Sequence, residues 1–478
     1  MFNPALIPSV GGRSVTGEVS GQDVVDLKKA LEMGYGTDVT SLSGAGNLRI
    51  QSLDKTLFST IVENKHFALF NLLAKSDATT TVDEFTEQSK IGGFLGGSTN
   101  SETGIIAAAN GEYKRRVGLV KYLMTRREVS YVTMQSNNIL NAQAVENQNA
   151  ALQLLTDAEF LCFEGNDKVV STEFAGVFQQ ISDYNETDHI IDAEGDSVVS
   201  VALIDKCAAT IASAGNYGMA SHVFASMKVQ SDLNQYLDPA YRVSISGKSQ
   251  ELLLGAPVKG IQTSWGDIAM VNDVFIRDEQ QQKPFEIDNA VLAAANVGLQ
   301  PTAVFSSGAG GATSKFKTAQ AGLYYYRITG LNANGESASI VSAQQTIPAG
   351  GQCAITITKS AGGAETGYAI YRGRLNGTNA VGDLRLVAKI PKDGATTTWI
   401  DENRFIPGTS KAYILTMNNN AISWRKYLPL TKFDLFPTQS AVIPWAVLLF
   451  GYLRITKRNQ HMVIKNIVAH SQEWKPFG

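Results

Sequence analysis

Residues that commonly carry chemistry are few and scattered in this chain. Its 478 residues include 5 His and 3 Cys. The histidines lie far apart in sequence and show none of the spacings of a zinc site. The cysteines, at positions 162, 207 and 353, are too few and too dispersed for a disulfide framework, and they fit a reducing compartment. We therefore expect no catalytic residue, no metal, no cofactor and no enzyme activity.

One tripeptide, Gly247-Lys248-Ser249, has the composition of a phosphate-binding loop. Such a loop needs a further Gly at the position of Arg242, because its backbone N–H groups wrap the phosphate. Arg242 therefore excludes a phosphate-binding loop at this place. The acidic run from Asp183 to Asp196 lacks the alternating pattern of a calcium-binding loop. We expect this run to be a solvated surface or a surface that faces a partner.

Two blocks of opposite charge lie within a chain whose formal net charge is only -3. Residues 114–127 hold six basic and no acidic residues, whereas residues 157–196 hold eleven acidic residues and one Lys. Blocks of opposite sign favour self-association, in which the basic segment of one copy meets the acidic surface of the next. The predicted contacts join Lys114, Arg115, Arg116, Lys121, Arg126 and Arg127 with Asp183, Glu186, Asp188, Asp192, Glu194 and Asp196. A solvated surface and nucleic-acid binding are the alternatives for the basic block.

The basic block lies in a predicted extended loop of strands, residues 76–134. Apolar residues alternate with polar ones around Val117 and Val129, as is typical of strands, and the Gly-rich run 92–97 marks the tip. The longest predicted helix begins at Ser136 and meets no Pro or Gly before Gly165. About 29 residues at 1.5 Å each predict a rod of about 43 Å.

The rest of the chain divides by composition. Residues 201–295 alternate between predicted helices (201–214, 227–237) and strands (221–225, 256–263, 268–276). Residues 296–408 are predicted to form about six short strands with Asn- and Gly-rich turns, which indicates an all-β sandwich. Residues 308–315 are predicted to be a linker into this sandwich. Two apolar strands, 446–455 and 461–468, are predicted to form a closing hairpin.

This order of elements resembles the major capsid proteins of tailed bacteriophages, which have the Hong Kong 97-type fold. Residues 164–167 and 174–177 resemble the turn after the spine helix of that family. Residues 221–238 and 266–276 resemble parts of its axial domain, and residues 446–467 resemble the closing hairpin of its peripheral domain. The segments 322–338, 367–377 and 386–403 are similar to strands of immunoglobulin-like or fibronectin type III-like modules.

The resemblance implies an α+β Hong Kong 97-like capsid fold with an inserted all-β Ig-like sandwich. The implied limits are an N-terminal arm (1–50), a peripheral domain with the spine helix (51–75, 135–200, 441–478), an extended β-loop (76–134), an axial domain (201–295, 409–440) and the inserted domain (296–408). Deletion of the inserted domain is expected to leave shell formation intact.

The implied function is that of a major capsid protein. Copies self-assemble into hexamers and pentamers of an icosahedral shell that encloses packaged phage dsDNA, with which the protein makes only non-specific contact. Further implied partners are a decoration or cement protein, a portal, and a scaffold or protease during assembly. The implied location is the virion, after assembly in the host bacterial cytoplasm.

Other functions compete with this one. An encapsulin-like bacterial cargo shell would share the architecture, and a phage surface adhesin would share only the β-sandwich. No membrane contact is expected, because the most apolar stretch, residues 441–453, is broken by Pro444 and Gly451 and is shorter than the roughly 20 residues of a membrane span.

Overall fold

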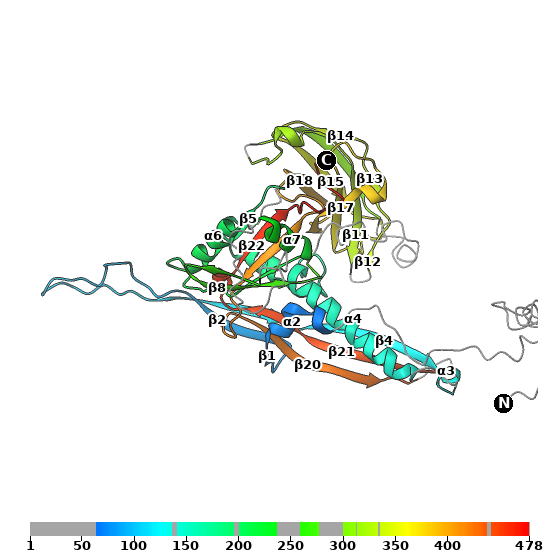
Figure 1. Ribbon diagram of the computed structural model, residues 1–478, viewed down its shortest axis with the longest axis horizontal. Coiled ribbons are helices and arrows are strands. Elements are labelled where there is room, and N and C mark those ends of the chain that lie inside the picture. Colours follow the sequence, from blue (N-terminus) through cyan, green and yellow to red (C-terminus); the bar gives the residue numbers. More distant parts are fainter. Residues whose placement is uncertain are drawn as a thin grey trace, which may run out of the picture. The chain divides into compact units, whose positions relative to one another are not determined.

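The structure is a computed structural model, and it describes residues 64–135, 141–195, 200–236, 259–276, 300–311, 313–332, 335–436 and 441–477. The chain divides into two units, residues 1–60 and 61–478, and the described residues all belong to the second. The predicted N-terminal arm lies outside the described residues. Within the second unit helices and strands are mixed, as the sequence predicts (Figure 1).

A four-stranded sheet joins segments from both ends of the described chain. Its order is β1-β20-β21-β4, with β1 parallel to β20 and the other pairs antiparallel. Apolar side chains of α4 (Ala142–Glu164) and α2 (Ala68–Leu72) pack with Trp424 and Trp445 of this sheet in one buried cluster. The strands are β1 (Ala74–Asp77), β4 (Lys121–Ser130), β20 (Ile422–Asp434) and β21 (Val442–Ile455), and the chain before β1 forms η5 (Asn64–His66) and α2 (Ala68–Leu72).

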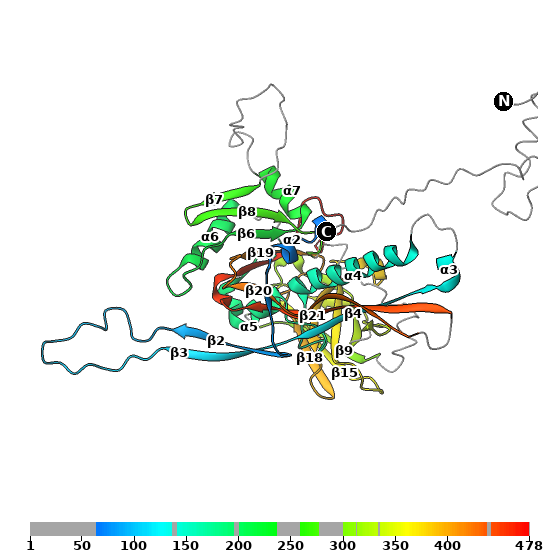
Figure 2. The ribbon, with the colours of Figure 1, turned by 90° about the horizontal axis from the view of Figure 1, so that it is seen from below.

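The predicted long helix is α4 (Ala142–Glu164), which lies along β4 and β21 (Figures 1 and 2). The side chain of Asn141 caps its first turn by accepting hydrogen bonds from the N–H groups of residues 143 and 144, and Gly165 follows its last residue. Its 23 residues span about 35 Å, less than predicted. Residues 136–140 lie outside the described part, and Tyr131–Gln135, expected as strand, form the short helix α3.

A two-stranded antiparallel ribbon, β2 (Val82–Lys90) and β3 (Glu112–Leu119), leaves this sheet at the left of Figure 2. The Gly-rich run forms part of its tip, where Gly92, Gly93 and Gly96 have positive φ. The predicted loop 76–134 is therefore longer than the ribbon. β4 belongs to the four-stranded sheet instead, because every residue from Lys121 to Ser130 pairs with β21.

A six-stranded sheet has the order β5-β22-β19-β6-β8-β7. Apolar residues of α6 and α7 pack with β6, β19 and β22 in a second buried cluster. The sequence predicts α6, β6 and α7 within two residues of their limits. The elements are α5 (Val177–His189), β5 (Ile190–Asp192), α6 (Val201–Ala212), β6 (His222–Ala225), α7 (Met227–Tyr236), β7 (Gly260–Thr263), β8 (Gly266–Asn272), β19 (Ser410–Leu415), η10 (Arg458–Gln460) and β22 (Met462–Ile467).

The predicted closing hairpin is wrong. β21 lies between β20 and β4 of the four-stranded sheet, whereas β22 lies between β5 and β19 of the six-stranded sheet. The two strands follow each other in sequence, but β21 pairs with the preceding strand β20 and with the distant β4, and β22 pairs with β19 and with the distant β5. Residues 409–440, predicted as one part of the axial domain, likewise contribute to both sheets: β19 belongs to the six-stranded sheet and β20 to the four-stranded sheet.

Residues 302–401 contain strands and two short 3-10 helices but no α-helix among the described positions. A three-stranded sheet (β18-β15-β9) and a five-stranded sheet around β11 and β16 share one buried cluster. We call this the all-β region; its Ig-like identity stays a prediction. Gly308, expected in a linker, pairs within β9. The elements are β9 (Thr302–Ala309), η8 (Thr318–Gln320), β10 (Gly322–Tyr324), β11 (Tyr326–Asn332), β12 (Gly335–Glu336), β13 (Ile340–Val341), β14 (Gln345–Ile347), β15 (Gly351–Thr358), β16 (Gly367–Gly373), η9 (Val381–Asp383), β17 (Leu384–Pro391) and β18 (Thr396–Asp401).

Candidate assembly surface

The ribbon is fixed to the four-stranded sheet by a carboxylate at its base. Asp83 of β2 accepts hydrogen bonds from Arg425 Nε (2.9 Å) and from the Tyr452 hydroxyl (2.6 Å), and Arg454 Nη1 lies 3.5 Å away. Burial alone would raise the pKa of Asp83, but the hydrogen bonds and charges of these partners outweigh it and hold the pKa below its ordinary value. Asp83 is therefore an ionised anchor between the ribbon and two strands of the sheet.

A second carboxylate on the same face of β2 extends this anchor. Glu87 lies four residues beyond Asp83, and alternate residues of a strand point to one side. Its Oε2 atom accepts from Arg116 Nε of β3 (3.0 Å) and from Arg458 Nη2 of η10 (3.2 Å). The base of the ribbon is thus held to the core, while its tip extends from it.

Gly118 is required at this anchor for close packing. It pairs with Asp83 across the ribbon. A β-carbon at this position would overlap the ring of Tyr452, the same side chain that donates to Asp83. The absence of a side chain at Gly118 therefore lets the ribbon lie against the sheet.

The six predicted basic residues have partners within their own chain. Arg115 and Arg116 pair with Glu84 and Glu87 of β2, and Arg127 donates to Gln153 of α4 (2.7 Å). Three further contacts are Lys114 with Glu112 (3.1 Å), Lys121 with the carbonyl of Ser171 (2.5 Å) and Arg126 with Glu128 (2.8 Å). Arg115 and Arg126 are the most exposed of the six in their ion pairs, at 74% and 62%.

Five of the six predicted acidic residues also have partners in the chain, and Asp196 lies outside the described residues. The partners are Lys168 for Asp183 (2.6 Å), Lys465 for Glu186 (3.2 Å), Asn185 for Asp188 (2.7 Å), Asn466 for Asp192 (2.7 Å) and Lys317 for Glu194 (2.7 Å). Arg116, Lys121 and Asp183 line one cleft beside the ribbon base. Among the described residues, however, no ion pair joins the basic set to the acidic set.

The tip of the ribbon carries an exposed apolar group that the charge pattern of the sequence does not indicate. Phe94 and Leu95 lie within the Gly-rich run that identified the tip, so the signal was present in the sequence. Their exposed fractions are 80% and 104%. We call the following set the apolar tip: Ile91, Phe94, Leu95, Ile105 and Ile106.

Groups that could hold a metal are not assembled in the described part of the chain: no three His, Cys, Asp or Glu residues cluster there. Two distant histidines do meet, since His189 Nδ1 lies 3.1 Å from the carbonyl of His461. Burial, with a smaller contribution from His189, lowers the pKa of His461 to about 3, so this ring is neutral. The helices of the described residues include none with the length and apolar character of a membrane span.

No protein-family model matches the sequence. Among solved structures, the chain is similar to the capsid of a native GTA particle (TM-score 0.46, 8% identity, covering 91% of this chain and 100% of that chain). It is also similar to the capsid of Myoviridae phage XM1 (0.44, 9%, 88% and 98%) and to the SrpI encapsulin of Synechococcus elongatus (0.41, 8%, 92% and 98%). Likenesses at these low TM-scores do not separate a phage capsid from an encapsulin.

Sequence comparison is more selective. The chain is 23% identical over 459 residues to a protein of Enterococcus phage phiEF24C that is provisionally named a major capsid protein, with 92% of this chain and 94% of that protein covered. It is 20% identical over 453 residues to the major capsid proteins of Staphylococcus phages S25-3 and K, covering 92% of this chain and 95% of each. These relatives agree with the predicted function of a phage major capsid protein and favour it over the encapsulin-like alternative.

Proposed function

We propose that this chain is a major capsid protein whose copies assemble into hexamers and pentamers of an icosahedral shell around packaged phage dsDNA. The observation that carries the proposal is the similarity to phage major capsid proteins over nearly the whole of both chains. The role is structural and involves no catalysed reaction. The protein would be part of the virion, after assembly in the cytoplasm of the host bacterium.

The architecture supports this function. A long helix packed on a four-stranded sheet, a projecting ribbon and a second mixed sheet correspond to the spine helix, peripheral domain, extended β-loop and axial domain of the Hong Kong 97-type fold. We propose that the all-β region is the inserted Ig-like module. Decoration, portal, scaffold and protease proteins belong to the same proposal as partners.

The ribbon supplies the strongest physical reason for self-association. Its two strands pair only with each other among the described residues, and an isolated pair of strands is at best marginally stable in water. Exposed clusters of large apolar side chains mark interaction sites. We propose that a second copy covers the apolar tip and thereby stabilises the ribbon.

The two charge blocks would act as a weaker, orienting contact. Exposed ion pairs within one chain contribute only about 0–1 kcal/mol each, so they are readily exchanged for pairs between copies. Arg115 and Arg126 are suited to a test, because both are exposed and their ion-pair partners, Glu84 and Glu128, are themselves at least 40% exposed. Arg116 is unsuited, because it also belongs to the ribbon anchor.

Electron microscopy of the expressed chain tests the proposal directly. Closed shells or capsomers are expected, and a persistent monomer at high concentration would contradict it. Native particles that hold DNA support the phage function, whereas particles that hold a protein cargo would favour the encapsulin-like one.

The charge contact is tested by the double reversal Arg115→Glu and Arg126→Glu, which is expected to reduce assembly without changing the folded monomer. The matched control reverses two exposed lysines outside the basic block, Lys359→Glu and Lys457→Glu, and changes the net charge equally. Equal loss of assembly in both variants would show that net charge, and not the basic block, is responsible.

A further inference from the structure

The C-terminal segment, residues 469–477, lies along the all-β region with alternate side chains buried. Gln472, Trp474 and Pro476 are buried, whereas Ser471, Glu473 and Lys475 are exposed. The segment is not a strand, because residues 470–471 and 476–477 form turns and residues 473–474 form a bend, but its side chains from Ser471 to Pro476 alternate between exposed and buried. The Leu375 N–H of the all-β region donates to the carbonyl of Pro476 (2.8 Å).

Trp474 is the centre of this contact. Its indole N–H donates to the carbonyl of Asp383 (3.2 Å), and the guanidinium of Arg385 lies 4.9 Å from its ring centroid. On the other side, a β-carbon at Gly408 would overlap the ring, and Gly408 has a φ of +66°. The indole therefore joins the start of β17 to the segment that leaves the all-β region.

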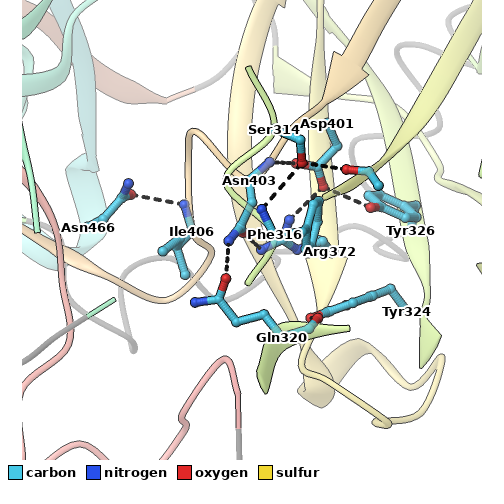
Figure 3. A network of polar contacts seen from close by, with 11 residues as sticks. Ser314, Phe316, Gln320, Tyr324, Tyr326, Arg372, Asp401, Asn403, Ile406 and Asn466 are labelled. Carbon is cyan, nitrogen blue, oxygen red and sulfur yellow. Dashed lines mark hydrogen bonds and ion pairs between the residues drawn. The ribbon is translucent and has the colours of Figure 1, made fainter. Parts of the chain in front are cut away.

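That exit segment is itself fixed by a buried polar network (Figure 3). Arg372, which is fully buried, donates to Asp401 (2.6 Å) and to Asn403 (2.7 Å). Beyond this network, the Ile406 N–H donates to the side chain of Asn466 (2.9 Å), which in turn donates to Asp192 (2.7 Å). The contacts lead from the core of the all-β region to β22 and β5 of the six-stranded sheet.

A third contact lies at the end of the long helix. Val169 and Val170, in the loop after α4, pack with Tyr371 and Leu386 of the all-β region in one buried cluster. The Thr366 hydroxyl donates to the carbonyl of Val169 (2.7 Å). The all-β region is thus held at three places, and these contacts argue against the expectation that it can be deleted without effect.

We propose that residues 469–477 act as a strap that fixes the orientation of the all-β region, and that release of this strap lets the region rotate about the two contacts that remain, at residues 402–409 and at Val169–Val170. The strap contacts the all-β region through one indole ring and a few hydrogen bonds. It is therefore the contact most readily opened.

The test uses double electron–electron resonance spectroscopy to measure the distance between the two spin labels of each of two pairs in the monomer. Spin labels are placed on Gln148→Cys of α4 and Thr398→Cys of β18, both exposed, and the three native cysteines are buried and so are not labelled. A second pair, Gln148→Cys with Ala214→Cys, reports on the rest of the fold. The intact chain and the control Lys475→Ala should give one narrow distance distribution for both pairs.

Trp474→Ala, and a chain that ends at Ser471, should broaden the distribution of the first pair only. A narrow first-pair distribution in both variants would overturn the proposal, as would a broad one in the intact chain. If Trp474→Ala also broadens the second pair, the fold itself is lost and Trp474→Leu, which keeps an apolar side chain there, replaces it. Broadening of the distance distributions of both pairs in every variant would show that Trp474 is a structural core residue and that residues 469–477 are not a strap.

Discussion

Glu159 and Asp273 form a buried carboxyl pair between three separate segments. Both are fully buried. The two oxygens of Glu159 accept from the backbone N–H groups of Leu69 and Phe70 in α2, each at 2.7 Å. Burial first, and the adjoining carboxyl group of Asp273 second, raise the pKa of Glu159 to about 9. The pair therefore keeps a proton at neutral pH. Cys162 is a further titratable group beside it, and burial raises the pKa of its thiol as well.

This proton makes stability depend on pH in a defined direction. A carboxyl group whose pKa rises on folding binds more protons in the folded state, so its contribution is complete below its ordinary pKa of 4.5 and is lost as the pH rises toward about 9. Asp273→Asn removes the second carboxyl group, so burial still raises the pKa of Glu159, but by less than burial and Asp273 raise it together. We expect the unfolding midpoint in urea to fall less with rising pH in this variant than in the native chain.

Glu159→Gln is the comparison for that experiment. The Gln amide nitrogen cannot accept a hydrogen bond, so one of the two N–H groups of α2 loses its acceptor and stability falls at every pH. The same slope of midpoint against pH in Asp273→Asn and in the native chain would contradict the shared proton.

At the residue scale, sequence reasoning found which residues are charged but not which residues they meet. The partners of Asp83 lie in β20 and β21, more than 300 positions away. Glu159 went unnoticed within the acidic block, because only the fold buries it. The position of the tip was predicted from its Gly-rich run, because Gly adopts a positive φ without strain and is therefore common in tight turns.

Among the elements, the ribbon depends on its anchor. The variant Gly118→Ala would push the ring of Tyr452 away and separate its hydroxyl from Asp83. Overpacking of this kind costs about 1–3 kcal/mol. We expect faster hydrogen exchange in β2 and β3 than in the native chain, measured by mass spectrometry.

The control for Gly118→Ala is Gly382→Ala, where an added methyl group meets no atom within 4 Å. It should leave exchange in the ribbon unchanged. Unchanged exchange in Gly118→Ala as well would show that the ribbon base does not depend on this packing.

The elements also show where sequence patterns succeed. α4 was predicted because a long run without Pro or Gly is a local property of the sequence, and its buried residues include Ala150, Leu154, Ala158 and Cys162. The pairing of β21 and β22 was predicted wrongly, because β21 pairs with the preceding strand β20 whereas β22 lies in the other sheet, between β5 and β19.

For the whole molecule, two kinds of contact are expected to respond differently to salt. Charges on exposed residues are screened beyond about 8 Å at physiological ionic strength, so the contribution of the basic block to assembly should decline as salt is added. Burial of the apolar tip should not weaken. We expect light scattering to show slower assembly at higher salt in the native chain.

The variant Phe94→Ser with Leu95→Ser should abolish assembly at every salt concentration. Since both side chains are at least 80% exposed, the unfolding midpoint of the monomer should not change. Glu102→Gln, also at the tip, is the control and should assemble normally. Assembly of the double variant at the native rate would exclude the tip as a contact.

The strand order makes each of the two large sheets depend on one strand from residues 442–467. β21 joins β20 to β4, and β22 joins β5 to β19. A chain that lacks Val442–Ile467 therefore leaves β4 and β5 without the strands that they pair with among the described residues. Such a truncated product cannot complete either sheet, and we expect it to be excluded from any assembly of complete subunits.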